Sequence, residues 1–147
     1  SKTCSFSFFF KRVCSIQENG SPHPRGQHEL GLYLAGQWYG LKFRPHLTTS
    51  SDLLEQLDVA LLQKHILKPL FRIEDPRTND RLGFVGGIRG TPELEKQVAS
   101  GEYACAFSMH PTRIEDLMAI ADAGEIMPPK STWFEPKLRD AMFCHLL

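Results

Sequence analysis

The sequence predicts an α/β protein of the α+β kind, in which a mixed sheet with an N-terminal β-hairpin carries three helices packed on it. Two observations predict this class. Apolar residues alternate with a period of two on both sides of Gly36, as in a hairpin. In the second half, helical spacing and short apolar runs follow one another, which is typical of a sheet covered by helices. The 147 residues are enough for a single domain.

The hairpin is the most detailed of these predictions. A two-residue turn at Gly36 and Gln37 pairs Leu34 with Tyr39, Leu32 with Leu41, and Leu30 with Phe43. All six apolar side chains then share one face of the sheet, because directly opposed residues of two strands point the same way. On the other face, Tyr33 lies opposite Gly40 and Glu29 faces Arg44.

Further strands are predicted from short apolar runs. Residues 5–13 are expected to form a strand that begins almost at the first residue of the chain. Residues 82–85, 103–109 and 141–147 are expected to form the others. A proline-rich loop over residues 127–136 precedes the last of them.

Three helices are predicted from apolar spacing and from the residues that bound them. The first covers residues 53–68, with Asp52 or Asp58 capping its start, and Pro69 ends it because proline lacks an N–H donor. The second begins with Thr91 as N-cap and ends before Gly101. The third covers residues 112–123, and its boundaries are set by a capping box of Thr112 with Glu115 and by Gly124.

The composition argues against several classes of function. Seventeen basic residues balance seventeen acidic ones, whereas a nucleic-acid binder normally carries a basic excess. The cysteines form no CxxC pair, which argues against a zinc site and favours free buried thiols in a reducing cytoplasm; they are Cys4, Cys14, Cys105 and Cys144. The apolar stretch at the start is too short to span a membrane. A cytoplasmic protein is therefore expected, without a metal, nucleic-acid or membrane partner.

Two turns in the second half are candidates for ligand contacts. Gly86, Gly87 and Arg89 belong to a glycine-rich turn between a strand and a helix start, where backbone N–H groups and the helix dipole favour an anion. The spacing matches neither a Rossmann fingerprint nor a P-loop, and a tight turn that needs glycine explains it as well. His110 follows a buried strand, where α/β sheets place ligands, although it also suits a turn that needs a hydrogen-bonding side chain.

A third candidate is the loop that contains Lys130, Ser131 and Thr132. These residues resemble the end of a Walker A motif, but no glycine is spaced upstream to hold phosphates and no helix follows, so we reject a P-loop. Prolines make the loop stiff, which suits a binding loop, an interface loop or a loop that packs Trp133 and Phe134 on the core. A serine or cysteine hydrolase is not supported, because no nucleophile elbow is present.

Several segments also carry a resemblance to a known family. They are residues 57–59 (LDV), 66–70 (ILKPL), 73–78 (IEDPRT), 86–90 (GGIRG) and 125–138 (EIMPPKSTWFEPKL). In this order, across about residues 30–147, they resemble the C-terminal part of the bacterial and archaeal domain of unknown function 1015 family. The resemblance implies that this chain is the C-terminal half of a longer bacterial protein.

The family's N-terminal half carries an Asp-Gly-His-His-Arg motif similar to that of ParB/sulfiredoxin-like proteins, among them free-serine kinases that bind nucleotide phosphates there. These 147 residues do not contain that motif. The resemblance therefore implies that the chain is inactive alone, whereas the full-length protein is an ATP- or ADP-dependent kinase. It assigns no catalytic role to the C-terminal signature and no cofactor to this chain.

The functional expectation combines these observations. The domain is expected to complete or cover the active site of a phosphoryl-transfer enzyme whose substrate is a small molecule such as free serine. Its partners are then the N-terminal half of the same polypeptide and a phosphorylated small molecule or nucleotide. The predicted anion-binding residues are Gly86, Gly87, Arg89, His110, Lys130, Ser131 and Thr132. The alternative is a structural or interaction domain with no ligand site of its own.

Overall fold

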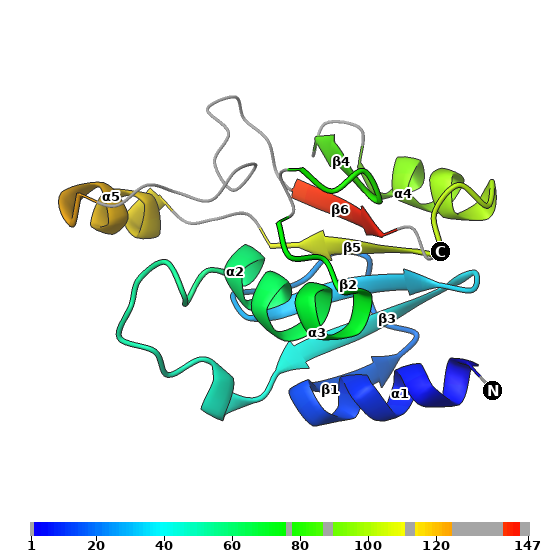
Figure 1. Ribbon diagram of the computed structural model, residues 1–147, viewed down its shortest axis with the longest axis horizontal. Helices are drawn as coiled ribbons and strands as arrows, with labels where there is room; N and C mark the ends of the chain where they lie inside the picture. The colour runs from blue at the N-terminus through cyan, green and yellow to red at the C-terminus, as the bar shows by residue number, and fades with distance from the viewer. Residues whose placement is uncertain (1, 76–77, 87–89, 111–113, 125–139, 145–147) are drawn as a thin grey trace.

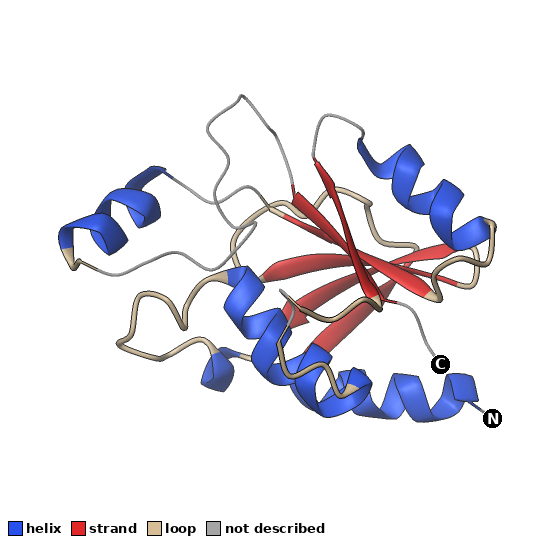
Figure 2. Ribbon diagram, turned by 45° about the horizontal axis from the view of Figure 1, so that its top comes forward, coloured by secondary structure: helices blue, strands red, loops and turns tan. Residues whose placement is uncertain are grey.

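The computed structural model describes residues 2–75, 78–86, 90–110, 114–124 and 140–144, and these build one sheet with helices on both faces (Figures 1 and 2). The strands are β1 (Cys14–Glu18), β2 (Glu29–Leu34), β3 (Gln37–Phe43), β4 (Leu82–Gly86), β5 (Cys105–Met109) and β6 (Asp140–Cys144). Their order across the six-stranded sheet is β1-β3-β2-β5-β6-β4. The α+β class is confirmed.

The expectation of a mixed sheet is wrong, because all five described strand pairings are antiparallel. In the second half, β4, α4 (Gly90–Ala99) and β5 follow one another in the order strand, helix, strand that the sequence predicted. However, β6 inserts between β4 and β5 and pairs antiparallel with both. The two parallel strands therefore never become neighbours, as in other split βαβ arrangements.

Residues 5–13, expected as a strand, belong instead to the helix α1 (Lys2–Val13). Phe6, Phe9, Phe10 and Val13 recur at helical spacing and all pack against the core, whereas Phe8 is 70% exposed. The first apolar residues fit a period of two as well as 3.6, and packing against the sheet favours the helical period. The first strand, β1, follows directly and was not predicted.

The hairpin forms, but its register differs by two residues from the expected one. The turn is at Ala35 and Gly36, both with positive φ (52° and 81°), as a type I′ turn requires. Leu34 therefore pairs with Gln37, Leu32 with Tyr39, and Leu30 with Leu41. A shift of two keeps every side chain on its face, and the six apolar residues do share the core face as predicted.

The core face of the sheet is covered by α1 and by a second helical run (Figure 1). This run consists of α2 (Asp58–Leu62), a π-helical segment (Gln63–Leu67) and α3 (Lys68–Phe71). A 3-10 helix, Pro45–Leu47, precedes it. Leu62, Ile66 and Leu67 are fully buried against the sheet.

Among the described residues, the thiols of Cys14 and Cys105 are free and buried, as the sequence predicted.

Pro69 does not end the helical run, contrary to expectation. The Lys68 N–H reaches back five residues to the Gln63 carbonyl, so the turn before the proline is widened. Pro69 then lies in the first turn of α3, the part of a helix in which proline is tolerated. The run ends at Phe71, and Arg72 adopts a left-handed conformation with φ 57°.

The opposite face carries α4 (Figure 2). Leu94 of this helix packs against Val85 and Ala106. Trp38 on this face donates a hydrogen bond from Nε1 to Glu95 Oε1 at 2.7 Å, which ties α4 to the hairpin. The predicted stop at Gly101 is confirmed by its φ of 82°. The remaining helix, α5 (Ile114–Asp122), lies beyond the end of the sheet and stops before Gly124 as predicted, while Thr112 is outside the described residues.

The loop over residues 19–28 crosses the α4 face of the sheet to connect β1 with β2. Gly20 donates from its N–H to the Trp38 carbonyl at 3.1 Å, and Ser108 Oγ donates to the Pro22 carbonyl at 2.7 Å. A Cβ at Gly20 would contact the backbone of Gly40 and approach the Tyr39 carbonyl carbon to 2.7 Å. Glycine is therefore required where loop and strand cross.

Replacing Gly20 by alanine should lower the free energy of unfolding by about 1–3 kcal/mol, because the methyl group meets backbone atoms that cannot move independently. The matched control is Gly26→Ala in the same loop, where an added Cβ meets nothing within 4 Å. Urea unfolding of both variants checks this. If the two variants are equally stable, the loop does not cross β3 at Gly20 as closely as described.

Across the part of the chain that the structure describes, no helix combines the length and apolar character needed to cross a membrane.

Candidate functional site

The register of the sheet brings several strand ends to one edge. Gly86 at the end of β4 pairs with Asp140 at the start of β6, and Ser108 near the end of β5 pairs with Ala141. β4 and β5 therefore run in the same direction and end together. β2 begins at this edge too, since Leu30 pairs with Met109. We call the place where β4 and β5 end and β2 and β6 begin the β4/β5 edge.

The segments predicted to bind an anion are next in sequence to residues at this edge. Gly86 directly precedes residues 87–89, His110 directly follows β5, and Asp140 directly follows residues 125–139. Gly86 and His110 thus lie at the same edge. The other predicted site residues, Gly87, Arg89, Lys130, Ser131 and Thr132, lie outside the described residues. A common contact of Arg89 and Lys130 with one oxyanion stays a prediction.

A second group of residues at this edge was not predicted as a site. His28, just before β2, adopts φ 68° and donates from its backbone N–H to Asp58 Oδ1 at 2.8 Å. The imidazole Nδ1 of His28 lies 3.4 Å from the same oxygen. Asp58 is the first residue of α2. One carboxylate oxygen therefore contacts both the backbone and the ring of His28.

The helix α5 is connected to the same group. Gln27 donates from Nε2 to Asp116 Oδ2 at 3.1 Å, and Asp116 lies in the first turn of α5. Since Gln27 and His28 are neighbours in the chain, the end of the loop joins the start of α2 to the start of α5. Three segments distant in sequence meet here. We call His28, Asp58, Gln27 and Asp116 the edge cluster.

The edge cluster shifts the ionisation of Asp58 towards neutrality. Burial is the main cause, and the negative charges of Asp116 and Glu29 add to it, while the hydrogen bond from the His28 N–H opposes them. Together they raise the pKa of Asp58 from 3.8 to about 7. A carboxyl group with such a pKa exchanges its proton at physiological pH, which is a property of acid–base groups in functional sites.

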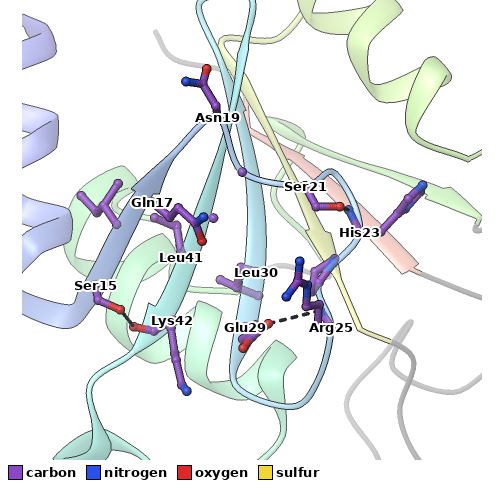
Figure 3. Close-up of a pocket in the computed structure, with 14 residues that line it drawn as sticks. Ser15, Gln17, Asn19, Ser21, His23, Arg25, Glu29, Leu30, Leu41 and Lys42 are labelled. Carbon is purple, nitrogen blue, oxygen red and sulfur yellow. Dashed lines mark hydrogen bonds between the residues drawn. The ribbon is translucent and has the colours of Figure 1, made fainter.

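A polar groove lies nearby, on the face crossed by the loop (Figure 3). It has a volume of about 490 Å³ and is lined by β1, β2, β3 and the loop. Arg25 and Lys42 line it together with Glu29, whose Oε2 accepts a hydrogen bond from the Arg25 N–H at 3.2 Å. Glu29 and Lys42 are also direct partners across β2 and β3. Because charges of both signs line the groove, it favours no single class of ligand.

Among the described residues, no three His, Cys, Asp or Glu side chains lie close enough to one another to bind a metal ion.

A sequence pattern pointed to Asp58, but no pattern pointed to its partner, His28. Asp58 was predicted as a possible helix cap, and it does begin α2, but its oxygen accepts from His28 rather than from the helix. The alternative cap, Asp52, accepts instead from the N–H of Leu54 at 2.9 Å. His28 precedes Asp58 by 30 residues, and no local pattern links positions so far apart.

Comparisons of the chain with protein-family models, with curated proteins and with solved structures gave no match.

Proposed function

We propose that this domain supplies anion contacts at the β4/β5 edge to an active site that transfers a phosphoryl group to or from a small molecule such as free serine. The observation that supports this proposal most strongly is the register of β4, β5 and β6. It places Gly86, His110 and Asp140 at one edge, so the glycine-rich turn, the turn after His110 and the Lys130 loop all adjoin that edge in sequence.

Phosphate recognition suits the residue types of these segments. Backbone N–H groups of a glycine-rich turn and the cations Arg89 and Lys130 offer charge-assisted hydrogen bonds to phosphate oxygens. Phosphoryl transfer depends mostly on positioning and on stabilising such charge, so a domain that supplies only these contacts has a defined part in the reaction. The nucleotide-binding half is the N-terminal part that the family resemblance implies.

Titration with inorganic phosphate, followed by the backbone amide signal of His110, tests the proposal. We expect Arg89→Ala and Lys130→Ala each to weaken phosphate binding about tenfold or more, since a charge-assisted hydrogen bond contributes about 1.5–3 kcal/mol. Lys96→Ala is the matched control, because this exposed lysine lies in the last turn of α4, towards the opposite edge. Absence of binding, or equal affinities in all three variants, would contradict an anion site.

The alternative, an interaction domain without a ligand site, has one observation in its favour. Ile114 and Met118 lie one turn apart on α5 and are 70% and 61% exposed. Exposed apolar side chains on one helix face are a common feature of surfaces that contact another protein segment. If phosphate does not bind, this is the function that remains.

A further inference from the structure

We propose that Cys105 and Cys144 are a site of reversible oxidation, at which a disulfide links β5 to β6. In the structure the Cys105 thiol is free and 2% exposed, so the state with the link is a second state of the protein. The inference goes beyond the proposed phosphoryl transfer and does not depend on it, because it rests on the register of the sheet and on the residue types alone.

The register places the two cysteines directly opposite each other. Cys105 begins β5, Cys144 ends β6, and the two are partners in the antiparallel pairing of these strands. The Cα atoms of opposed residues in antiparallel strands lie about 4.5–5.5 Å apart. Disulfides join residues whose Cα atoms are about 4.4–6.8 Å apart. The backbone therefore holds the two positions at a separation that a disulfide bridges without rearrangement of the strands.

The two positions also belong to the same face of the sheet, as a disulfide requires. Directly opposed residues of antiparallel strands share a face. Cys105 belongs to the core cluster on the face covered by α1 and α3. Leu82 of β4, the other direct partner of Cys144, belongs to the same cluster. The register thus places Cys144 between two positions of the core face.

The third cysteine of the described strands, Cys14, has no such partner. It lies on β1 at the other side of the sheet, where its direct partner is Phe43. Burial raises the pKa of the Cys14 thiol to about 12, which keeps it in the thiol form, whereas the thiolate is the form that reacts with a disulfide. Cys14 is therefore a control cysteine for the pair.

The link would fasten one whole side of the sheet. Among the described strands, β4 pairs only with β6, and β6 joins it to β5 (Figure 1). A disulfide between β5 and β6 therefore holds β4 in place as well. It also closes the chain from residue 105 to residue 144, which reduces the conformational entropy that this segment gains when β6 separates. Oxidation should then slow the opening of β4 and β6.

The oxidant is a low-molecular-weight disulfide such as oxidised glutathione. The thiolate of one cysteine attacks a sulfur of this disulfide, whose S–S bond breaks and releases one molecule of thiol. The thiolate of the other cysteine attacks the protein sulfur of the mixed disulfide and releases the second thiol. The protein loses two hydrogen atoms and the oxidant gains them, so an excess of thiol reverses the reaction. Because Cys105 is buried, the exchange requires a local opening of the sheet.

Peptide mapping of the full chain after incubation with oxidised glutathione tests the pair. Free thiols are alkylated, the protein is digested without reduction, and the joined peptides are identified by mass spectrometry. We expect the main disulfide of the wild-type protein and of Cys14→Ala to join Cys105 to Cys144. In Cys144→Ala we expect Cys105 to carry glutathione or to stay free. A main disulfide between other cysteines, or no link between these two at any concentration of oxidant, overturns the proposal.

Amide hydrogen exchange tests what the link does to the fold. We expect the amides of β4 and β6 to exchange about tenfold or more slowly in the oxidised protein than in the reduced one, because closing the chain makes their opening less favourable. Dithiothreitol should restore the faster exchange. Cys144→Ala given the same oxidant should exchange as the reduced protein does. Equal exchange of the linked and the reduced wild-type protein would show that the disulfide does not fasten β4 and β6, and would overturn that part of the inference.

Discussion

Phe107→Ala should lower the free energy of unfolding by about 3–5 kcal/mol, the usual cost of removing a fully buried aromatic ring from a core. Phe107 on β5 is completely buried. Its ring centroid lies 6.5 Å from that of Phe10 on α1 and 6.4 Å from that of Phe71 on α3. The truncation therefore removes contacts of the central strand with two separate helices. Urea unfolding followed by circular dichroism measures the loss.

Phe8→Ala is the matched control for this prediction. It removes the same ring from α1, but Phe8 is 70% exposed, and surface substitutions usually change stability by less than about 0.5 kcal/mol. A small effect of Phe107→Ala, or an equal effect of the two variants, would mean that α1 does not pack on β5 through Phe10.

The stability of the wild-type protein should fall as the pH rises from about 4 to about 7, and Asp58→Asn should remove much of this fall. The pKa of Asp58 is raised from 3.8 to about 7, so between these values the folded protein holds a proton that the unfolded chain releases. Stability then decreases with pH, by up to about 4 kcal/mol for a shift of roughly three units at a buried group. The contribution is fully present below pH 4 and lost as the pH passes 7.

Urea unfolding of both proteins at pH 4.5 and pH 8 checks the sign. The carboxamide still accepts the His28 N–H but carries no charge, so Asp58→Asn should gain stability over the wild type at pH 8 and little at pH 4.5. If the free energies of unfolding of the two proteins change with pH in the same way, the pKa of Asp58 is not raised in the folded protein.

The sequence by itself determined where two of the helices end and which side chains of the hairpin face the core. The ends of α4 and α5 follow from Gly101 and Gly124, whose positive φ values of 82° and 72° cost glycine less than other residues. The shared core face of the hairpin follows from alternation with period two. Alternation is unchanged by a shift of two residues, however, so the register depended on the turn: Ala35 and Gly36 have the twist that a hairpin needs.

Only the tertiary structure decided the pairings that join distant segments. Residues 5–13 fit two periods, and burial of Phe10 against the sheet made them helical. The insertion of β6 between β4 and β5 has no local signal, since strand order depends on which arrangement buries the most surface together. The same holds for the contact of His28 with Asp58. A buried carboxylate acquires its shifted pKa from neighbours that only the folded chain assembles, and no local pattern in a sequence records them.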